Sequence, residues 1–235
     1  MKPRVAVVTF PGSNDDWDAL RAVALMGGEP VATWHGEASL HGADAVILPG
    51  GFSYGDYLRT GAIARFAPVM AAVREHAEEG KPVLGVCNGF QILCEAGLLP
   101  GALIRNRGLA FICRWIHVRT EGPADQGAFG LSPREVLQVP IKHGEGQFVA
   151  SPEELERIES EGLVAMRYCA PDGAIDERFN PNGSVHGIAG LRNQARNVLG
   201  MMPHPEHAVD PDLGPTGGHA VFHWLLAAAR DRVHA

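Results

Sequence analysis

One cysteine lies where the sequence predicts a tight turn between a strand and a helix. Residues 85–91 read Gly-Val-Cys-Asn-Gly-Phe-Gln, with a glycine two positions before and two positions after Cys87. The glycines let the backbone turn sharply, and the amino end of the following helix favours negative charge on the sulfur. The pattern predicts a nucleophilic thiolate. The alternative is that Cys87 is a small buried hydrophobic residue in an ordinary turn.

A second segment offers the base that such a nucleophile needs. His204 and Glu206 are two residues apart, and in an extended segment such residues project to the same side. The intervening Pro205 disfavours helical backbone at His204 and limits rotation of the pair. We predict that His204 is the catalytic imidazole and that Glu206 orients it. A solvated surface turn, or a metal site that contains His204 and His207, is the alternative.

Attack on a carbonyl also requires hydrogen-bond donors for the charge that develops on its oxygen. The backbone amide of Asn88 follows the nucleophile directly, and glycines at positions 50 and 51 let the main chain approach a substrate closely. These segments are therefore the candidate oxyanion donors. The loop lacks the Gly-Lys-Ser/Thr ending of a phosphate-binding P-loop, so it predicts no nucleotide site of that kind.

These residues follow strands of a predicted α/β fold. Strand-like apolar runs alternate with helix-like segments, which predicts a doubly wound, mostly parallel sheet whose ligands bind at the carboxyl ends of the strands. The predicted strands are residues 5–10, 31–34, 45–48, 83–86, 163–169 and 198–202, and the predicted helices are residues 15–26, 68–79, 90–96 and 220–230, with a further helix that begins at Ser151.

The middle of the chain follows a different pattern. Residues 109–120 and 135–141 are rich in β-forming residues, and the Gly/Pro-rich segment 122–133 between them has no helical periodicity. We interpret this region as an antiparallel β excursion from the main sheet.

Composition narrows the classes of function. The chain has 235 residues, 46% of them hydrophobic, and a net charge of −7, which excludes intrinsic disorder and argues against a nucleic-acid partner. No apolar run approaches the roughly 18 residues of a membrane span. With no export signal and no CxxC spacing, the four cysteines suggest reduced thiols and a cytoplasmic protein. We expect Cys94, Cys113 and Cys169 to be packed in the core.

Several strings resemble those of a known enzyme family. Residues 85–91 and 203–206 resemble the class I, triad-type glutamine amidotransferases, which carry Cys, His and Glu in this chain order. Further strings are similar to those of the glutaminase subunits of phosphoribosylformylglycinamidine synthases, at residues 11–14, 48–59, 61–65, 143–146 and 182–185. The likeness extends from residue 5 to about residue 210, and the tyrosine-containing run 48–59 is more specific than the triad.

The resemblance implies a flavodoxin-like sheet and one amidotransferase domain over residues 1–235. It implies that Cys87 attacks the side-chain amide of glutamine, that His204 protonates the departing ammonia, and that water hydrolyses the resulting thioester. Glu206 would hold His204 in the useful tautomer. The remaining implied site residues are Gly51, Phe52 and Asn88, whose backbone would face the oxyanion, and Gln91 and His143, which would lie near glutamine.

The resemblance also implies partners. A large synthetase subunit would bind ATP, magnesium and formylglycinamide ribonucleotide, and a small third subunit would complete the complex, with ammonia passing internally between the active sites. This chain would hold no cofactor and no metal. Residues 54–65 would form part of the interface or simply a folded loop that shields the site.

Two positions depart from the family pattern. Asp15 stands where the family commonly has Cys, and His207 stands where Arg usually follows the Pro-His-Pro-Glu string. Asp15 can cap or precede a helix, so we expect little effect there and no contact of either residue with the triad. His207 lacks the permanent charge of arginine, which weakens the expectation of a salt bridge to a partner.

Two other classes of function are weighed against a glutaminase subunit. One is a stand-alone cysteine hydrolase or peptidase of the same fold, but such relatives usually have His directly after the nucleophile, where this chain has Asn88. The other is a binding module without chemistry, which the presence of all three catalytic residue types argues against.

Overall fold

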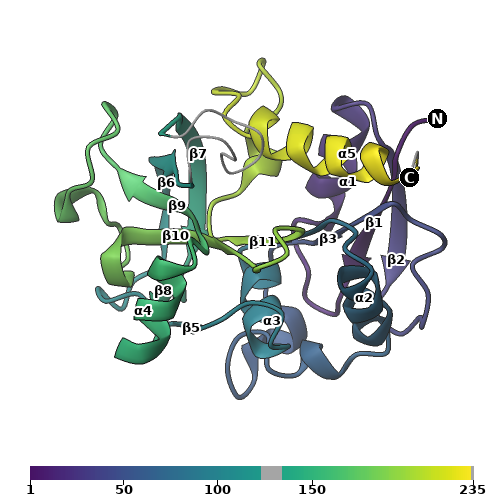
Figure 1. Ribbon diagram of the computed structural model, residues 1–235, viewed down its shortest axis with the longest axis horizontal. Coiled ribbons are helices and arrows are strands. Elements are labelled where there is room, and N and C mark those ends of the chain that lie inside the picture. Colours follow the sequence, from purple (N-terminus) through teal and green to yellow (C-terminus); the bar gives the residue numbers. More distant parts are fainter. Residues whose placement is uncertain (123–133, 234–235) are drawn as a thin grey trace.

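The structure is a computed structural model that describes residues 1–122 and 134–233. Its centre is a nine-stranded sheet in the order β2-β1-β3-β4-β11-β10-β9-β6-β7, with helices on both faces (Figure 1). The first five strands in this order pair in parallel, and the remaining pairs are antiparallel. The sheet therefore has a parallel half and an antiparallel half, where the sequence predicted a mostly parallel sheet with an antiparallel excursion.

The parallel half has the flavodoxin-like order 2-1-3-4-5 when β11 is counted as the fifth strand. Its central strands are short apolar runs buried on both faces, the pattern that parallel sheets require. The strands are β1 (Arg4–Thr9), β2 (Glu29–Trp34), β3 (Ala45–Leu48), β4 (Val83–Val86) and β11 (Val198–Met201).

Four helices sandwich this half. The helices α1 (Asp16–Leu25) and α5 (His219–Val233) cover one face, and α2 (Val69–Glu78) and α3 (Asn88–Glu95) cover the other (Figure 1). The predicted helices all form, and α3 begins two residues earlier than the sequence pattern indicated, directly after Cys87.

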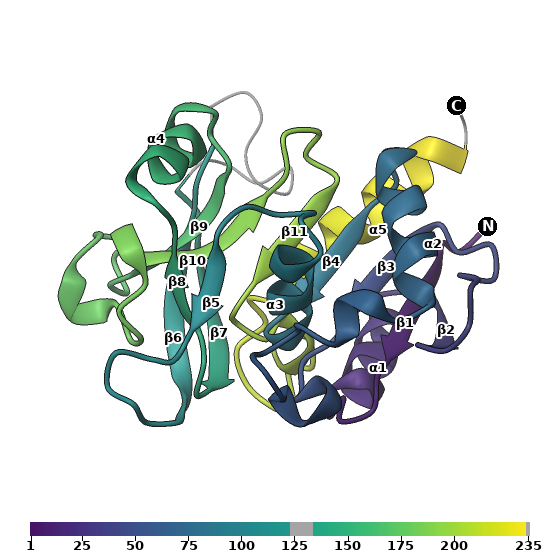
Figure 2. The ribbon, with the colours of Figure 1, turned by 90° about the horizontal axis from the view of Figure 1, so that it is seen from below.

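The antiparallel half extends the same sheet away from these helices, as the turned view shows (Figure 2). The predicted antiparallel excursion over residues 109–120 and 135–141 is confirmed: these segments contain strands β6 and β7, which pair with each other. Most of the connecting segment 122–133 lies outside the described residues. The strands are β10 (Ile188–Arg192), β9 (Val164–Cys169), β6 (Ile112–Thr120) and β7 (Val136–His143).

Three smaller elements complete this half. Helix α4 (Pro152–Ser160) begins at Ser151, whose hydroxyl accepts a hydrogen bond from the Glu154 amide at 3.2 Å, so the predicted cap is confirmed. Strands β5 (Ala102–Ile104) and β8 (Gln147–Val149) form a separate antiparallel pair. The sequence reading missed β5, β8 and β10. All three are short, and Gly190 weakens the strand signal of β10.

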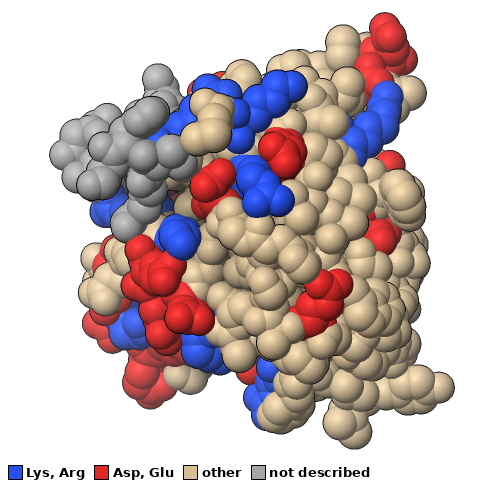
Figure 3. All heavy atoms as spheres, turned by 90° about the vertical axis from the view of Figure 1, so that its right-hand side faces the viewer, with Lys and Arg blue, Asp and Glu red and all other residues tan. Residues whose placement is uncertain are grey.

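Within the described ranges no helix is long and apolar enough to cross a membrane. On the face shown in Figure 3, basic and acidic side chains are interspersed among broad uncharged areas, and no extended basic surface is visible. A basic surface is the electrostatic footprint expected of a nucleic-acid binder.

Candidate active site

Cys87 occupies a strained turn between β4 and α3. Its backbone has φ 49° and ψ −104°, and its amide donates to the Met201 carbonyl at 2.7 Å. A methyl group on Gly85 would lie 2.7 Å from the backbone of Gly89, and one on Gly89 would overlap the Leu48 carbonyl oxygen. Both glycines are therefore required sterically, and the turn has the form of a nucleophile elbow.

His204 lies beside this elbow because β11 pairs in parallel with β4. Met201 is in register with Val86, so the segments after the two strands leave the same edge of the sheet together. His204 is fully buried, and its Nδ1 lies 2.6 Å from Oε1 of Glu206. This geometry places the Nδ1 proton toward the carboxylate, and Nε2 has no nitrogen or oxygen partner within the described part of the chain.

Electrostatics keep the His204 ring protonated. Burial alone would lower its pKa, but the charges of Glu206 and Cys87 outweigh burial and raise the pKa to about 10. An imidazolium next to the sulfur stabilises a thiolate, and the amino end of α3 adds to this effect. The predicted triad of Cys87, His204 and Glu206 is thus brought together with its charges arranged for nucleophilic attack.

A cavity of about 370 Å³ opens over the thiol, within the usual range of small-molecule sites. Five of the predicted site residues line it: Gly51, Phe52, Cys87, Gln91 and His143. The other lining residues come from the loops after β1 and β3, from the end of β7 and the loop after it, and from the segment before β6: Asn14, Asp15, Asp56, Thr60, Phe111, Lys142, Gly144 and Glu145.

Two of the predicted substrate residues also hold the cavity wall together. Gln91 accepts from the Asn88 side chain at 2.8 Å and donates to the Glu145 carbonyl at 2.5 Å, so it ties α3 to the loop after β7. His143 donates from Nδ1 to the Asn106 side chain at 3.0 Å. Burial and the nearby charge of His204 lower the pKa of His143 to about 4, which leaves a neutral ring with Nε2 as an acceptor.

The three predicted oxyanion segments differ in whether their backbone amides are already hydrogen-bonded. The Phe52 amide already donates to the Gly12 carbonyl at 2.8 Å, so in this conformation it is not available to a substrate. Asn88 is the first residue of α3, where helix geometry leaves the amide without an intrahelical acceptor. Gly51 lines the cavity with φ 141°, a conformation that glycine adopts readily.

The expectation for Asp15 and His207 is wrong. Asp15 precedes α1, but its side chain makes no cap hydrogen bond. It pairs with Lys142, and its carboxylate lies 3.2 Å from His207 Nε2 and 3.7 Å from His204 Nδ1. His207 Nε2 in turn lies 3.6 Å from Oε1 of Glu206. Both residues therefore contact the triad, because the start of α1 and the end of β11 lie at the same edge of the sheet.

Sequence reasoning gave no role to three charged cavity residues. Asp56 lies within the family-specific run 48–59. Lys142 directly precedes the string 143–146, and Glu145 lies within it. Burial, and then the charge of Glu145, raise the pKa of Asp56 to about 6. Their positions within family-specific strings were the available signal, but strings alone do not show which side chains face the cavity.

The other cysteines differ from Cys87. Cys169 is buried and Cys94 partly so, and burial raises the pKa of both thiols, that of Cys169 to about 11. Cys113 is exposed, so its predicted place in the core is wrong. It lies at the outer end of β6, where three successive residues face solvent.

Comparison with known proteins identifies relatives of this arrangement. The model of the CobB/CobQ-like glutamine amidotransferase domain matches residues 2–216. The phosphoribosylformylglycinamidine synthase subunit PurQ of Rubrobacter xylanophilus is 55% identical over 227 residues, which cover 97% of this chain and 99% of that protein. The corresponding subunit of Bradyrhizobium diazoefficiens is 53% identical over 221 residues, with 93% and 95% covered.

A solved structure agrees with these relatives. A chain in the structure of PurLQS from Thermotoga maritima is 40% identical and superposes with a TM-score of 0.83, covering 97% of this chain and 99% of that one. The similarity extends over nearly the whole chain and therefore includes both halves of the sheet.

Proposed function

Because the chain belongs to the family of CobB/CobQ-like glutamine amidotransferase domains, we infer that it is the glutaminase subunit of a phosphoribosylformylglycinamidine synthase. It releases ammonia from glutamine and supplies it to a synthetase subunit for conversion of formylglycinamide ribonucleotide to its amidine in purine synthesis. The observation that carries this inference is the triad itself: Cys87 lines the cavity, and the buried His204–Glu206 pair lies behind it.

The geometry supports a two-step reaction. The Cys87 thiolate attacks the side-chain carbonyl carbon of glutamine, and the amides of Asn88 and Gly51 are the proposed donors to the oxyanion. The His204 imidazolium then gives its Nε2 proton to the departing nitrogen, which leaves as ammonia while a glutamyl thioester forms. Neutral His204 next takes a proton from water, which attacks the thioester and releases glutamate and the thiolate.

The acidic part of the cavity wall suits the amino-acid end of the substrate. Asp56 and Glu145 place two carboxyl groups there, and Oδ1 of Asp56 has no hydrogen-bond partner among the described residues. The α-ammonium group of glutamine would supply the missing donor and positive charge. His143 Nε2 is buried and has no hydrogen-bond partner among the described residues. It can therefore accept a second hydrogen bond from a substrate N–H.

The reaction also requires partners. Free ammonia would be protonated and diluted in bulk water, so it must pass directly to the synthetase subunit, and a small third subunit completes the proposed complex. ATP and magnesium would bind to the synthetase, with this chain acting as a single amidotransferase domain. The proposed docking surface includes Tyr57, Leu58 and Phe66, large apolar side chains that are 74%, 92% and 74% exposed beside the cavity loop.

This function places the protein in the cytoplasm. The four cysteines, all of them free in the structure, fit a reducing compartment.

The test is reconstitution. Co-expression with the synthetase and third subunits should yield a complex that amidinates formylglycinamide ribonucleotide with glutamine and ATP. An electrophilic glutamine analogue added to the complex should label Cys87 and leave the exposed Cys113 unmodified. Labelling spread over several thiols, or a complex that uses ammonia but never glutamine, would contradict the proposal.

A further inference from the structure

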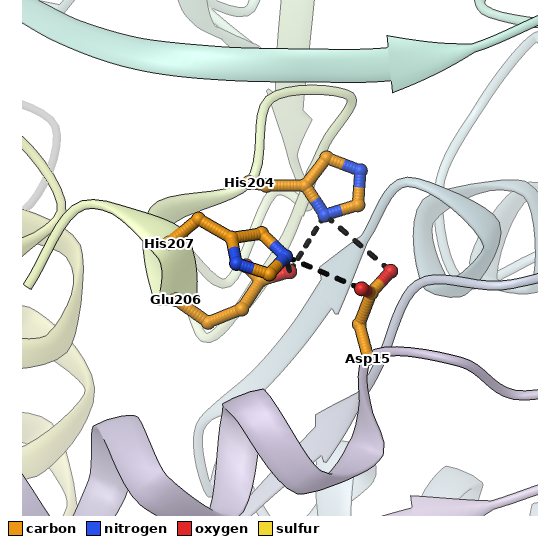
Figure 4. A group of neighbouring side chains, drawn as sticks. All are labelled: Asp15, His204, Glu206 and His207. Carbon is orange, nitrogen blue, oxygen red and sulfur yellow. Dashed lines mark hydrogen bonds and ion pairs between the residues drawn. The ribbon is translucent and has the colours of Figure 1, made fainter. Parts of the chain in front are cut away.

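Asp15 and His207, the two departures from the family pattern, meet beside the triad. Their side chains come from the start of α1 and from the segment after β11, and they converge with His204 and Glu206 on one small volume (Figure 4). Four potential metal-ligand atoms, two imidazole nitrogens and two carboxylate oxygens, all lie within 4.8 Å of one another.

We propose that Asp15, His204, Glu206 and His207 form a binding site for a divalent transition-metal ion such as zinc, and that metal bound there blocks the glutaminase reaction. Two imidazoles with two carboxylates are a donor set that zinc accepts in tetrahedral geometry. The blocking effect rests on the proposed function, whereas metal binding itself does not.

The distances fit a tetrahedral ion. Ligands about 2.0–2.1 Å from zinc stand roughly 3.3 Å from one another. His207 Nε2 lies 3.2 Å from Asp15 and 3.6 Å from Glu206, and His204 Nδ1 lies 3.7 Å from Asp15 and 2.6 Å from Glu206. Small side-chain rotations therefore suffice to surround an ion.

Charge and access also favour a metal. Oε2 of Glu206 is buried without a hydrogen-bond partner in the described ranges, so this carboxylate has unused acceptor capacity. The Lys142 ammonium group, which pairs with Asp15, would be displaced by the ion. An ion can enter because Asp15 lines the cavity and the side chain of His207 is 28% exposed.

A metal at this site would block the glutaminase reaction because it binds His204 through Nδ1. In Figure 4, Nδ1 of His204 faces the cluster and the other ring nitrogen points away from it. A metal on Nδ1 displaces the hydrogen that the ring shares with Glu206, and this proton leaves to solvent. Nε2 keeps its hydrogen on a ring that is no longer an imidazolium, and giving up that hydrogen would leave an imidazolate. His204 therefore becomes a poor proton donor to the departing nitrogen, and Glu206 no longer orients it.

The first experiment measures binding without activity. Calorimetric titration of Cys87→Ser with zinc chloride should give one site per chain, since the rival thiolate ligand has been removed. Adding His207→Gln should weaken that site at least about tenfold. Adding His41→Gln, at a histidine that pairs with Glu37 on the surface, should leave it unchanged. A Cys87→Ser protein that binds no zinc, or binding that His207→Gln does not alter, overturns the proposal.

The second experiment measures the block in the assembled complex, through release of glutamate from glutamine. Zinc should inhibit the wild-type complex, and a chelator should restore its activity. His207→Gln, measured against its own zinc-free rate, should require at least about tenfold more zinc for half-inhibition. Equal inhibition of both proteins would place the metal on Cys87 and overturn the proposal. A wild-type complex without glutaminase activity before zinc is added would contradict the proposed function, while the calorimetry would still test the site.

Discussion

The two halves of the sheet contribute differently to the cavity. The parallel half supplies Cys87 and His204 from the carboxyl ends of adjacent strands β4 and β11. The antiparallel half supplies Lys142, His143 and Glu145 from the end of β7 and the loop that follows it. Bond-forming groups thus come from the half that contains the glycine turn around Cys87, and the added half supplies further cavity-lining groups beside Asp56 and Gln91 of the parallel half.

This difference teaches where the fold tolerates change. In the parallel half, backbone segments approach one another so closely that even a methyl group is excluded at Gly89, whereas one on Gly144 in the antiparallel half would lie 3.8 Å from the Phe111 ring. The turn that carries Cys87 therefore depends on close backbone packing, whereas the loop after β7 is held to α3 by the side chain of Gln91.

The largest expected effect is on the nucleophile. Cys87→Ala should lower glutamine-dependent synthesis by the complex at least about 1,000-fold, because no covalent intermediate can form. Synthesis supplied with ammonia should continue, since the synthetase is untouched. Cys113→Ala, at an exposed thiol, is the matched control and should keep both activities. Loss of both activities in Cys87→Ala would mean that this residue is structural.

The next effect tests backbone packing in the two halves. Gly89→Ala should destabilise the protein by about 3 kcal/mol or more, because its methyl group overlaps a carbonyl oxygen that the strand holds in place. Gly144→Ala meets only an ordinary van der Waals contact and should change stability by less than about 1 kcal/mol. Urea unfolding of both variants measures the difference, and equal values would remove the distinction between the halves.

A third effect concerns acid stability in the parallel half. Burial, helped by the charge of Lys81, lowers the pKa of His76 on α2 to about 4 from an ordinary value of 6.5. The unfolded chain therefore binds this proton more readily, so stability is lost as pH falls from about 6.5 to about 4, by up to roughly 3 kcal/mol. The His76→Gln variant has no imidazole at this position, so its stability should not show this part of the decrease.

The measurement is urea unfolding of wild type and His76→Gln at several pH values between 7 and 4. The difference in the free energy of unfolding between wild type and His76→Gln should become smaller as pH falls. A constant gap would show that His76 does not titrate differently in the folded and unfolded states.

The smallest effect tests the tie between the halves. Gln91→Ala removes the link from α3 to the Glu145 carbonyl, so the substrate-facing loop loses its anchor. The KM for glutamine should rise roughly tenfold, about the value of one or two hydrogen bonds, with little change in kcat. Steady-state glutaminase kinetics of the complex decide this, and a fall in kcat at constant KM would instead give Gln91 a part in the chemistry.

Local patterns in the sequence determined much of the fold. Short apolar runs that alternate with helical segments predicted the parallel half, since such strands bury both faces. The cap at Ser151 and the glycines around Cys87 were readable because each depends on its immediate neighbours. Strand β10 was missed because its five residues include a glycine, and it gains stability only by pairing with β9 and β11.

The triad was also readable, because each of its parts carries a local signal: an elbow around Cys87 and an extended His204-Pro205-Glu206 string. Contacts between segments that are far apart in the chain could not be predicted from the sequence. Asp15 and His207 are 192 positions apart, and only the pairing of strands that brings the start of α1 to the end of β11 puts them 3.2 Å from each other. The sequence by itself determined which groups can react, and the tertiary structure decided which charges surround them, because electrostatic interactions depend on separation in space and on burial.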